Sequence, residues 1–421
     1  MKKVLLGTSA IALASAFAST AGAADWDVKV GGYMEQHLTY SSADVKGFVG
    51  DDYDGVDVKS DTEIHFKPSI TLDNGLKIGA VVELEGNTGG DQIDESYIQI
   101  TGSFGQVLLG NENSAGYKMS YGAPDVSFYG INSGTQTSNI PFSGQNLNPL
   151  SNGATPLDLT TPLGTGTVAV TDGIGETAGL NHGNDVFRGT LGSTFLENGR
   201  NNDAARITYF SPRFAGFQVG LSYARDPGDD SSAQVNNRVA AISDIIDVGA
   251  NYVNSFGGFD VALSGRWGIA TDNRTAVPGT DIGEDPQVWG AGINLGFAGV
   301  TIGGSFAEQN GAANQDGRSF DAGISYETGP WGFSFTYFNG ENVNNENAAA
   351  LNAAGTASAN DEKHQAFLLA GTYALAKGVS LGAYGGYFDF DEETGDAGGP
   401  NVTTGDDIDG FVIGTGIKVS F

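Results

Sequence analysis

The feature that most constrains this chain is an alternation of apolar and polar residues that recurs along most of its length. In residues 26–40 the even positions are mostly apolar and the odd positions mostly polar or charged, and residues 62–72, 76–84 and 411–421 repeat the pattern. A period of two puts successive side chains on opposite faces of a strand, so each segment predicts a β-strand with one apolar face. The segments are about ten residues or longer, whereas strands of soluble domains have about five to six. This length favours strands that cross a bilayer.

The first 23 residues have the make-up of a secretory signal peptide. Lys2 and Lys3 precede a short apolar run over residues 4–17, and the small-residue triplet Ala21-Gly22-Ala23 follows. A signal peptidase accepts such small residues, so we expect cleavage after the triplet and a mature chain, residues 24–421, that forms one β-barrel domain. After the leader no window holds ~20 consecutive apolar residues, which excludes a membrane protein built from transmembrane helices.

The composition excludes several classes of function. The formal net charge of −30 becomes −32 once the two lysines of the leader are removed, so nucleic acid would be repelled. The chain has no cysteine, which rules out disulfides and thiol chemistry. No phosphate loop or dinucleotide fingerprint occurs, and the close spacing of a zinc site is missing among the four histidines, His37, His65, His182 and His364. We therefore expect no cofactor.

The connections between the alternating segments are of two kinds. Seven are short and lie at residues 73–75, 102–105, 211–216, 255–258, 296–299, 328–330 and 376–378. They alternate with eight mostly longer, polar segments at about residues 41–61, 87–91, 113–203, 226–245, 271–286, 310–317, 341–363 and 391–408. Short turns on one side and long loops on the other are typical of outer-membrane barrels.

This rhythm predicts an all-β fold, a 16-stranded antiparallel transmembrane β-barrel with both chain ends on the short-turn side. Closure leaves no unpaired strand edge in lipid. A barrel of this size encloses more volume than the side chains of its wall can fill, so the lumen would hold water and form a pore. Tyrosines and tryptophans of the apolar parity fall mostly near strand ends, where amphipathic rings suit the headgroup boundary.

Three stretches resemble a known family, and together with the matching rhythm of turns and loops the resemblance covers nearly all of the mature chain. Residues 94–110 resemble the fourth and fifth strands of the Gram-negative general porins, residues 205–223 resemble the hairpin after that family's third loop, and Phe421 resembles its C-terminal aromatic residue, an assembly signal. The resemblance implies a homotrimer in the outer membrane, in contact with lipid and lipopolysaccharide, with periplasmic turns and extracellular loops. It also implies passive diffusion of small hydrophilic solutes and ions.

The segment 113–203 occupies the position of the family's third loop, which folds inward and narrows the pore. In the family, basic residues of the wall face acids of this loop. By that likeness the candidate constriction residues are Lys67, Arg206, Lys29 and His37 on the wall, and Asp125, Asp172, Glu176, Asp185, Arg188 and Arg200 on the loop. A rim position for Lys29 and His37, and a solvated position for the two loop arginines, are open alternatives. Many members carry a basic residue where Asn111-Glu112-Asn113 stands here, so their ion preference does not transfer directly.

The charge pattern predicts weak cation selectivity. Acids in the first and eighth loops, at residues 51–57 and 391–393, would enrich cations at the pore mouth within a Debye length of ~8 Å. The same loops are candidate sites for divalent cations, although they lack the spacing of a calcium hand, and a solvated acidic rim is the alternative. The residues that the alternation turns inward include both basic residues and acids, so the wall itself is mixed in sign. These acids are Asp27, Glu35, Glu63, Glu83, Glu85 and Glu95.

Other functions stay open at this point. A solute-specific porin would need rows of aromatic residues on the inner wall, and only scattered candidates occur, namely Tyr33, Tyr97, Tyr384 and Phe388. A barrel adhesin or structural protein would need long structured loops, and only residues 113–203 are long enough. Residues 378–382 match the G-x-S-x-G pattern of a nucleophile, but at the start of a strand rather than on a strand-to-helix turn. We therefore expect no enzyme.

Overall fold

The computed structural model describes residues 25–45, 54–86, 92–128, 130–131, 204–226, 242–273, 283–312, 317–345, 359–392 and 407–421. The strands within them are β1 Asp27–Val45, β2 Gly55–Thr71, β3 Lys77–Gly86, β4 Ile93–Gly102, β5 Gly105–Asn111, β6 Ala205–Phe210, β7 Phe217–Ala224, β8 Ile242–Phe256, β9 Phe259–Asp272, β10 Gly283–Phe297, β11 Val300–Ala312, β12 Gly317–Thr328, β13 Trp331–Asn345, β14 Ala359–Ala376, β15 Val379–Glu392 and β16 Asp407–Ser420. The helix of the described residues is α1, Ala115–Met119. No helix in this part of the chain is long and apolar enough to cross a membrane.

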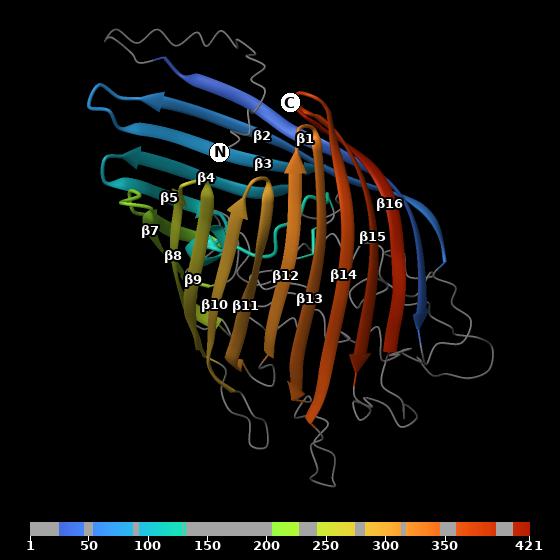
Figure 1. Ribbon diagram of the computed structural model, residues 1–421. Coiled ribbons are helices and arrows are strands. Elements are labelled where there is room, and N and C mark those ends of the chain that lie inside the picture. Colours follow the sequence, from blue (N-terminus) through green and yellow to red (C-terminus); the bar gives the residue numbers. More distant parts are fainter. Residues whose placement is uncertain are drawn as a thin grey trace, which may run out of the picture.

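The strands form one closed antiparallel barrel in which each strand pairs with its neighbours in sequence. The seam lies between β1 and β16, which run in register from Tyr33 opposite Ser420 to Val45 opposite Ile408 (Figure 1). At its end the backbone N–H of Phe421 donates to the carbonyl of Gly32, and that of Gly32 donates back, both at 3.1 Å. The predicted 16-stranded antiparallel barrel is confirmed, and its backbone groups are satisfied without a free edge.

The short connections lie where the sequence predicts them, and six of the eight long ones are shorter than predicted because the flanking strands extend into them. In the first hairpin, the N–H of Gly75 donates to the carbonyl of Leu72 at 2.8 Å, and Gly75 has a positive φ of 79°. The loop predicted at residues 41–61 gives way to strand as far as Val45 and again from Gly55. The interpretation of these ends as loop was wrong because side chains beyond the lipid are polar on both faces, which removes the alternation while the backbone ladder continues.

The two faces of the barrel are the reverse of those of a soluble sandwich. On β1, Leu38 is 53% exposed on the outside, while Glu35 and His37 are only 3% and 5% exposed on the inside. The outer face also carries aromatic rings, such as Trp267 and Trp289. An apolar outer surface of this extent is stable only in contact with lipid.

Part of the inner face departs from the polar character that alternation predicts. Small and branched apolar residues lie there on β7 to β11 and at the start of β6, and they form a buried cluster of Ala204, Ala224, Ile245, Ala270, Val288 and Ala307. Because these side chains are at most 1% exposed, open water does not line this side of the barrel.

We expect the seam to depend on the backbone of the last residue more than on its ring. Deleting Phe421 removes two backbone hydrogen bonds, at about 1 kcal/mol each, and should lower the free energy of unfolding by about 2 kcal/mol. Phe421→Ala keeps both bonds and is the matched control. Urea unfolding from lipid vesicles measures the difference, and an equal loss in both variants would show that the ring, not the seam, is responsible.

Candidate functional site

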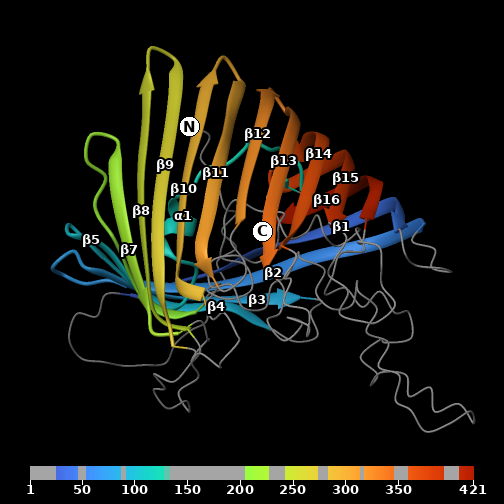
Figure 2. The same cartoon turned by 90° about the horizontal axis from the view of Figure 1, so that it is seen from below.

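The chain turns into the barrel directly after β5. Ser114 caps α1, and its hydroxyl accepts a hydrogen bond from the N–H of Tyr117 at 3.3 Å. Ala115 and Met119 of the helix pack on Leu108 of β5 and Phe210 of β6 in a small buried core. We call residues 113–128 the inner segment, and both views show it within the ring of strands (Figures 1 and 2).

Side chains of five strands hold the backbone of the inner segment. Near the start of the segment, Ser222 accepts a hydrogen bond from the backbone N–H of Ala115 at 2.6 Å, and Asp247 accepts one from that of Gly116 at 2.6 Å. Further along, Ser264 accepts from the N–H of Tyr121 at 2.9 Å. Asp321 accepts from the N–H of Ala123 at 2.8 Å, and Ser334 from that of Val126 at 3.1 Å. These acceptors lie on β7, β8, β9, β12 and β13. The described start of the third loop is therefore folded inward, as the resemblance implied, and hydrogen bonds to side chains of the barrel wall hold it there.

The strongest of these anchors is a buried ion pair. Arg266 on β9 donates from Nη2 to Asp247 Oδ2 at 2.6 Å, and both side chains are 1% exposed. The other oxygen of Asp247 accepts from the N–H of Gly116. A Cβ at Gly116 would lie 2.0 Å from Asp247 Oδ1, so only glycine permits this approach. The sequence did not single out Asp247, although the alternation along β8 turns it inward, as the alternation along β9 turns Arg266.

Asp125, a predicted constriction acid, closes a turn of the inner segment against β13. Its carboxylate accepts from the N–H of Ser127 at 2.8 Å, the N–H of Ile131 at 2.9 Å and the hydroxyl of Ser334 at 3.0 Å. These bonds make Asp125 an anchor of the loop.

The predicted wall residues lie apart from one another. Lys29 is half exposed at the start of β1 and pairs with Asp27 at 3.2 Å, which places it near the short-turn rim. His37 is buried, with Nε2 3.3 Å from Glu35 and its ring centroid 6.0 Å from that of Phe128. Arg206 is also buried on β6.

Lys67 is the wall candidate that faces the open lumen. Its side chain is 40% exposed, and its Nζ lies 2.7 Å from Glu83 Oε1 and 3.2 Å from His65 Nδ1. The remaining loop candidates, Asp172, Glu176, Asp185, Arg188 and Arg200, lie outside the described residues, as do the acidic loop positions 51–53 and 393.

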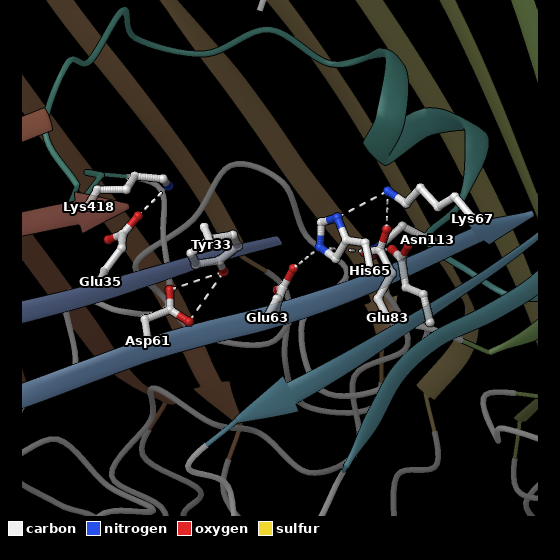
Figure 3. A network of polar contacts seen from close by, with 10 residues as sticks. Tyr33, Glu35, Asp61, Glu63, His65, Lys67, Glu83, Asn113 and Lys418 are labelled. Atoms are coloured by element: carbon white, nitrogen blue, oxygen red, sulfur yellow. Dashed lines mark hydrogen bonds and ion pairs between the residues drawn. The ribbon is translucent and has the colours of Figure 1, made fainter. Parts of the chain in front are cut away.

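A row of acids follows β1 to β4 on the inner face. We call it the acidic wall, and it consists of Glu35, Asp61, Glu63, Glu83, Glu85, Asp94 and Glu95. The strand register sets it, because Glu63 lies opposite Glu85 and His65 lies opposite Glu83. Figure 3 shows the labelled members of the row pointing from the strands toward the inner segment.

Polar contacts tie the acidic wall together. The hydroxyl of Tyr33 donates to Asp61 at 3.3 Å, His65 Nε2 lies 2.7 Å from Glu63, and Lys418 pairs with Glu35 (Figure 3). Sequence analysis gave several of these acids inward parity, but it did not bring them together, because the bases of the same parity made the wall look evenly mixed.

The middle of the acidic wall, on β2 and β3, is accessible, whereas Glu35 and Glu95 toward its ends are buried. Glu63 and Glu83 keep 17% and 13% of their side chains exposed, and Lys67 keeps 40%. By contrast, inward-facing Asp321 and Thr336 on β12 and β13 are 3% and 0% exposed. The path that solvent can take through the described part of the barrel therefore runs along β2 and β3.

Comparisons with known proteins agree with this architecture. A family model described as Gram-negative porin matches residues 8–393. No curated protein matches the chain.

Several solved structures share the fold. The outer membrane protein OmpT of Vibrio cholerae in its trimer form is 14% identical, with 94% of this chain and 99% of that chain covered and a TM-score of 0.54. The outer membrane channel DcaP of Acinetobacter baumannii is 14% identical over 96% and 99%, with a TM-score of 0.53. The anion-selective porin from Comamonas acidovorans is 16% identical over 94% and 100%, with a TM-score of 0.52.

We expect Asp247→Ala to release the inner segment and to break the buried ion pair with Arg266. Breaking a buried ion pair by removing one partner costs about 3–5 kcal/mol, and the bond to Gly116 is lost as well. Urea unfolding in lipid vesicles should show this loss. Asp260→Ala, at an exposed acid near the turn before β9, is the control, and a loss below about 1 kcal/mol in Asp247→Ala would contradict the anchoring role.

Proposed function

Because the chain belongs to the Gram-negative porin family, we propose that it forms a water-filled channel in the outer membrane that prefers cations and passes small hydrophilic solutes by diffusion. The family and the closed barrel establish the outer-membrane channel. The preference for cations and the nature of the solutes are the proposal. The observation that carries it is the acidic wall on the accessible side of the lumen.

In this proposal the charges that set ion preference lie along the path itself rather than at the pore mouth. On the inner face of β1 to β4 the acids outnumber the lysines. Lys67 of β2 pairs with Glu83 of the acidic wall, and Lys418 of the neighbouring strand β16 pairs with Glu35. An ion about 6 Å from one unit charge in water gains or loses about 0.7 kcal/mol, which is roughly a threefold change in local concentration. Several such acids within a Debye length of ~8 Å favour cations at physiological salt.

The shared fold does not decide ion preference. The Comamonas acidovorans structure is described as an anion-selective porin, and its similarity to this chain is one of fold alone. The residues that line the path therefore set the sign. In this chain we assign that role to Asp61, Glu63 and Glu83, with Lys67 as the basic member of the constriction.

The other constriction candidates take supporting places in this proposal. Arg206 and His37 are buried behind the path, Lys29 lies at the rim, and Asp125 holds the inner segment. The acids and arginines of residues 172–200 are proposed to complete the constriction from the loop side. The family likeness and the trimer form of OmpT support a homotrimer, and residues 1–23 are proposed to be the cleaved leader.

Catalysis and sugar selectivity have weaker support. Ser380 of the G-x-S-x-G match lies inside β15, paired with Ala374 and Lys418, whereas a nucleophile elbow sits on a strand-to-helix turn. Tyr384 and Phe388 are buried and Tyr33 and Tyr97 lie on different strands, so these rings make no aromatic row. We therefore propose a non-enzymatic, non-specific channel.

Purified protein in a planar bilayer should give stepwise conductance, and the reversal potential in a KCl gradient should have the sign of cation preference. The acidic wall is the reason for that sign. A protein that inserts without conducting would refute the channel, while anion preference would refute only the assignment of the wall.

The double variant Asp61→Asn/Glu63→Gln should lower the cation-to-anion permeability ratio about two- to threefold or more, because two charges leave the accessible wall. Its measurement is the reversal potential at fixed salt. Asp73→Asn removes one carboxylate charge from the exposed turn after β2 and should leave the ratio unchanged. Equal ratios in the wild type and the double variant would show that other residues select the ion.

A further inference from the structure

A bulge between β3 and β4 gathers carboxylates at the end of the acidic wall. Val82 pairs with Ser96, but Leu84 pairs with Ile93, so two residues of β4 stand opposite one residue of β3. A bulge of this kind re-aims side chains that would otherwise alternate. The two residues are Asp94 and Glu95, and one carboxylate oxygen from each lies within 4.8 Å of the others and of one from Glu83.

A fully buried carboxylate adjoins this group just before the inner segment begins. Glu112 follows the last residue of β5, and since Asn111 pairs with Ser96, it lies beside Glu95. The carboxyl groups of Glu112 and Glu95 interact directly, and both residues are buried, at 0% and 8% exposure. Two adjoining buried carboxylates are unstable as a pair of bare charges, so a proton or a cation must lie between them.

The described partners leave oxygen atoms of this junction without a donor. Glu112 Oε1 accepts from the N–H of Asn113 at 2.9 Å and pairs with Lys118 at 2.6 Å, but Glu112 Oε2 is enclosed and has no hydrogen-bond partner in the structure. Asn113 donates through Nδ2 to Glu95 at 2.9 Å, while its carbonyl Oδ1 is equally enclosed and unpaired. Such orphaned buried oxygens require an explanation, and a bound ion is one.

We propose that Glu83, Asp94 and Glu95 bind a divalent cation of the calcium type, with Glu112 and the first residue of the inner segment, Asn113, supplying further oxygens. Calcium takes six to eight oxygen ligands at about 2.3–2.6 Å, including carboxylates and Asn carbonyls. Two ligands on opposite sides of such an ion are about 4.8 Å apart, and one oxygen from each of the three carboxylates lies within 4.8 Å of the others, so a single ion of this size can contact all three. Magnesium demands a more regular octahedron than this irregular set offers.

The overlapping acid triads on β2 and β3 are weaker candidates. In the group of Glu63, His65 and Glu83, His65 already pairs with both carboxylates, and neither that group nor the one of Glu63, Glu85 and Asp94 includes a buried oxygen without a donor. The assigned site also joins the wall to the point where the inner segment leaves it. A bound ion would therefore fix the start of the constriction, and this assignment does not depend on the ion preference of the pore.

Terbium(III), a luminescent substitute for calcium, tests the site directly. Tyr97 lies next to Glu112 and Glu95 and can sensitise the emission of a bound terbium ion. Full-length protein in detergent micelles, freed of metal with a chelator, should give saturable tyrosine-sensitised emission that calcium displaces, and calorimetry should show calcium binding. No saturable binding in the wild type would overturn the proposal and leave a shared proton as the neutralising group.

Glu95→Gln and Glu112→Gln change one oxygen each without loss of volume, and each should weaken calcium binding at least tenfold. Asp73→Asn should bind as the wild type does, and Asp61→Asn/Glu63→Gln should retain binding because neither residue belongs to the assigned set. Heat-modifiable electrophoretic mobility confirms that each variant is folded, and Glu112→Gln serves if Glu95→Gln does not fold. Wild-type affinity in a folded Glu112→Gln or Glu95→Gln protein would refute the assignment, whereas bilayer conductance in the same samples reports on the pore separately.

Discussion

The rest of this structure depends on the need to satisfy every backbone N–H and C=O group inside lipid, where no water can do so. The closed ladder of sixteen strands meets that need, and its two-residue period turns the apolar side chains outward. A ring of this size cannot be filled by its own inward side chains. Another part of the chain must therefore narrow the interior, and the inner segment does part of this.

The backbone of the inner segment also needs hydrogen-bond partners inside the barrel. It lies inside the barrel without pairing as a strand, so its backbone N–H groups need acceptors from the wall, and Ser222, Asp247, Ser264, Asp321 and Ser334 provide them. These short side chains bring the segment close to the strands. Because that side of the lumen is occupied, the accessible path lies along β2 and β3, where the acids stand.

The sequence predicted the barrel well because alternation and turn chemistry are local. Each hairpin, such as the one at Gly75, can be recognised from a few adjacent residues. The site was predicted less well because its contacts are not local: Gly116 meets Asp247, and Val126 meets Ser334. Parity gives the face of a strand but not the burial of a side chain, so Arg206 and Lys67 looked equivalent although only Lys67 faces the open lumen.

The residues that follow β5 carry a negative charge where the family likeness implies a positive one, and this affects the junction between the acidic wall and the inner segment. Glu112 lies in the stretch Asn111-Glu112-Asn113, where the family likeness implies a basic residue directly after Gly110. The negative charge of Glu112 is met by Lys118 of α1 and adjoined by Glu95. A basic residue at this point would pair with Glu95 and leave the junction neutral by itself. With an acid there, the junction is neutral only when a further positive charge is present. The wall and the inner segment then hold together through a shared counter-charge, which couples the shape of the constriction to the ions around it.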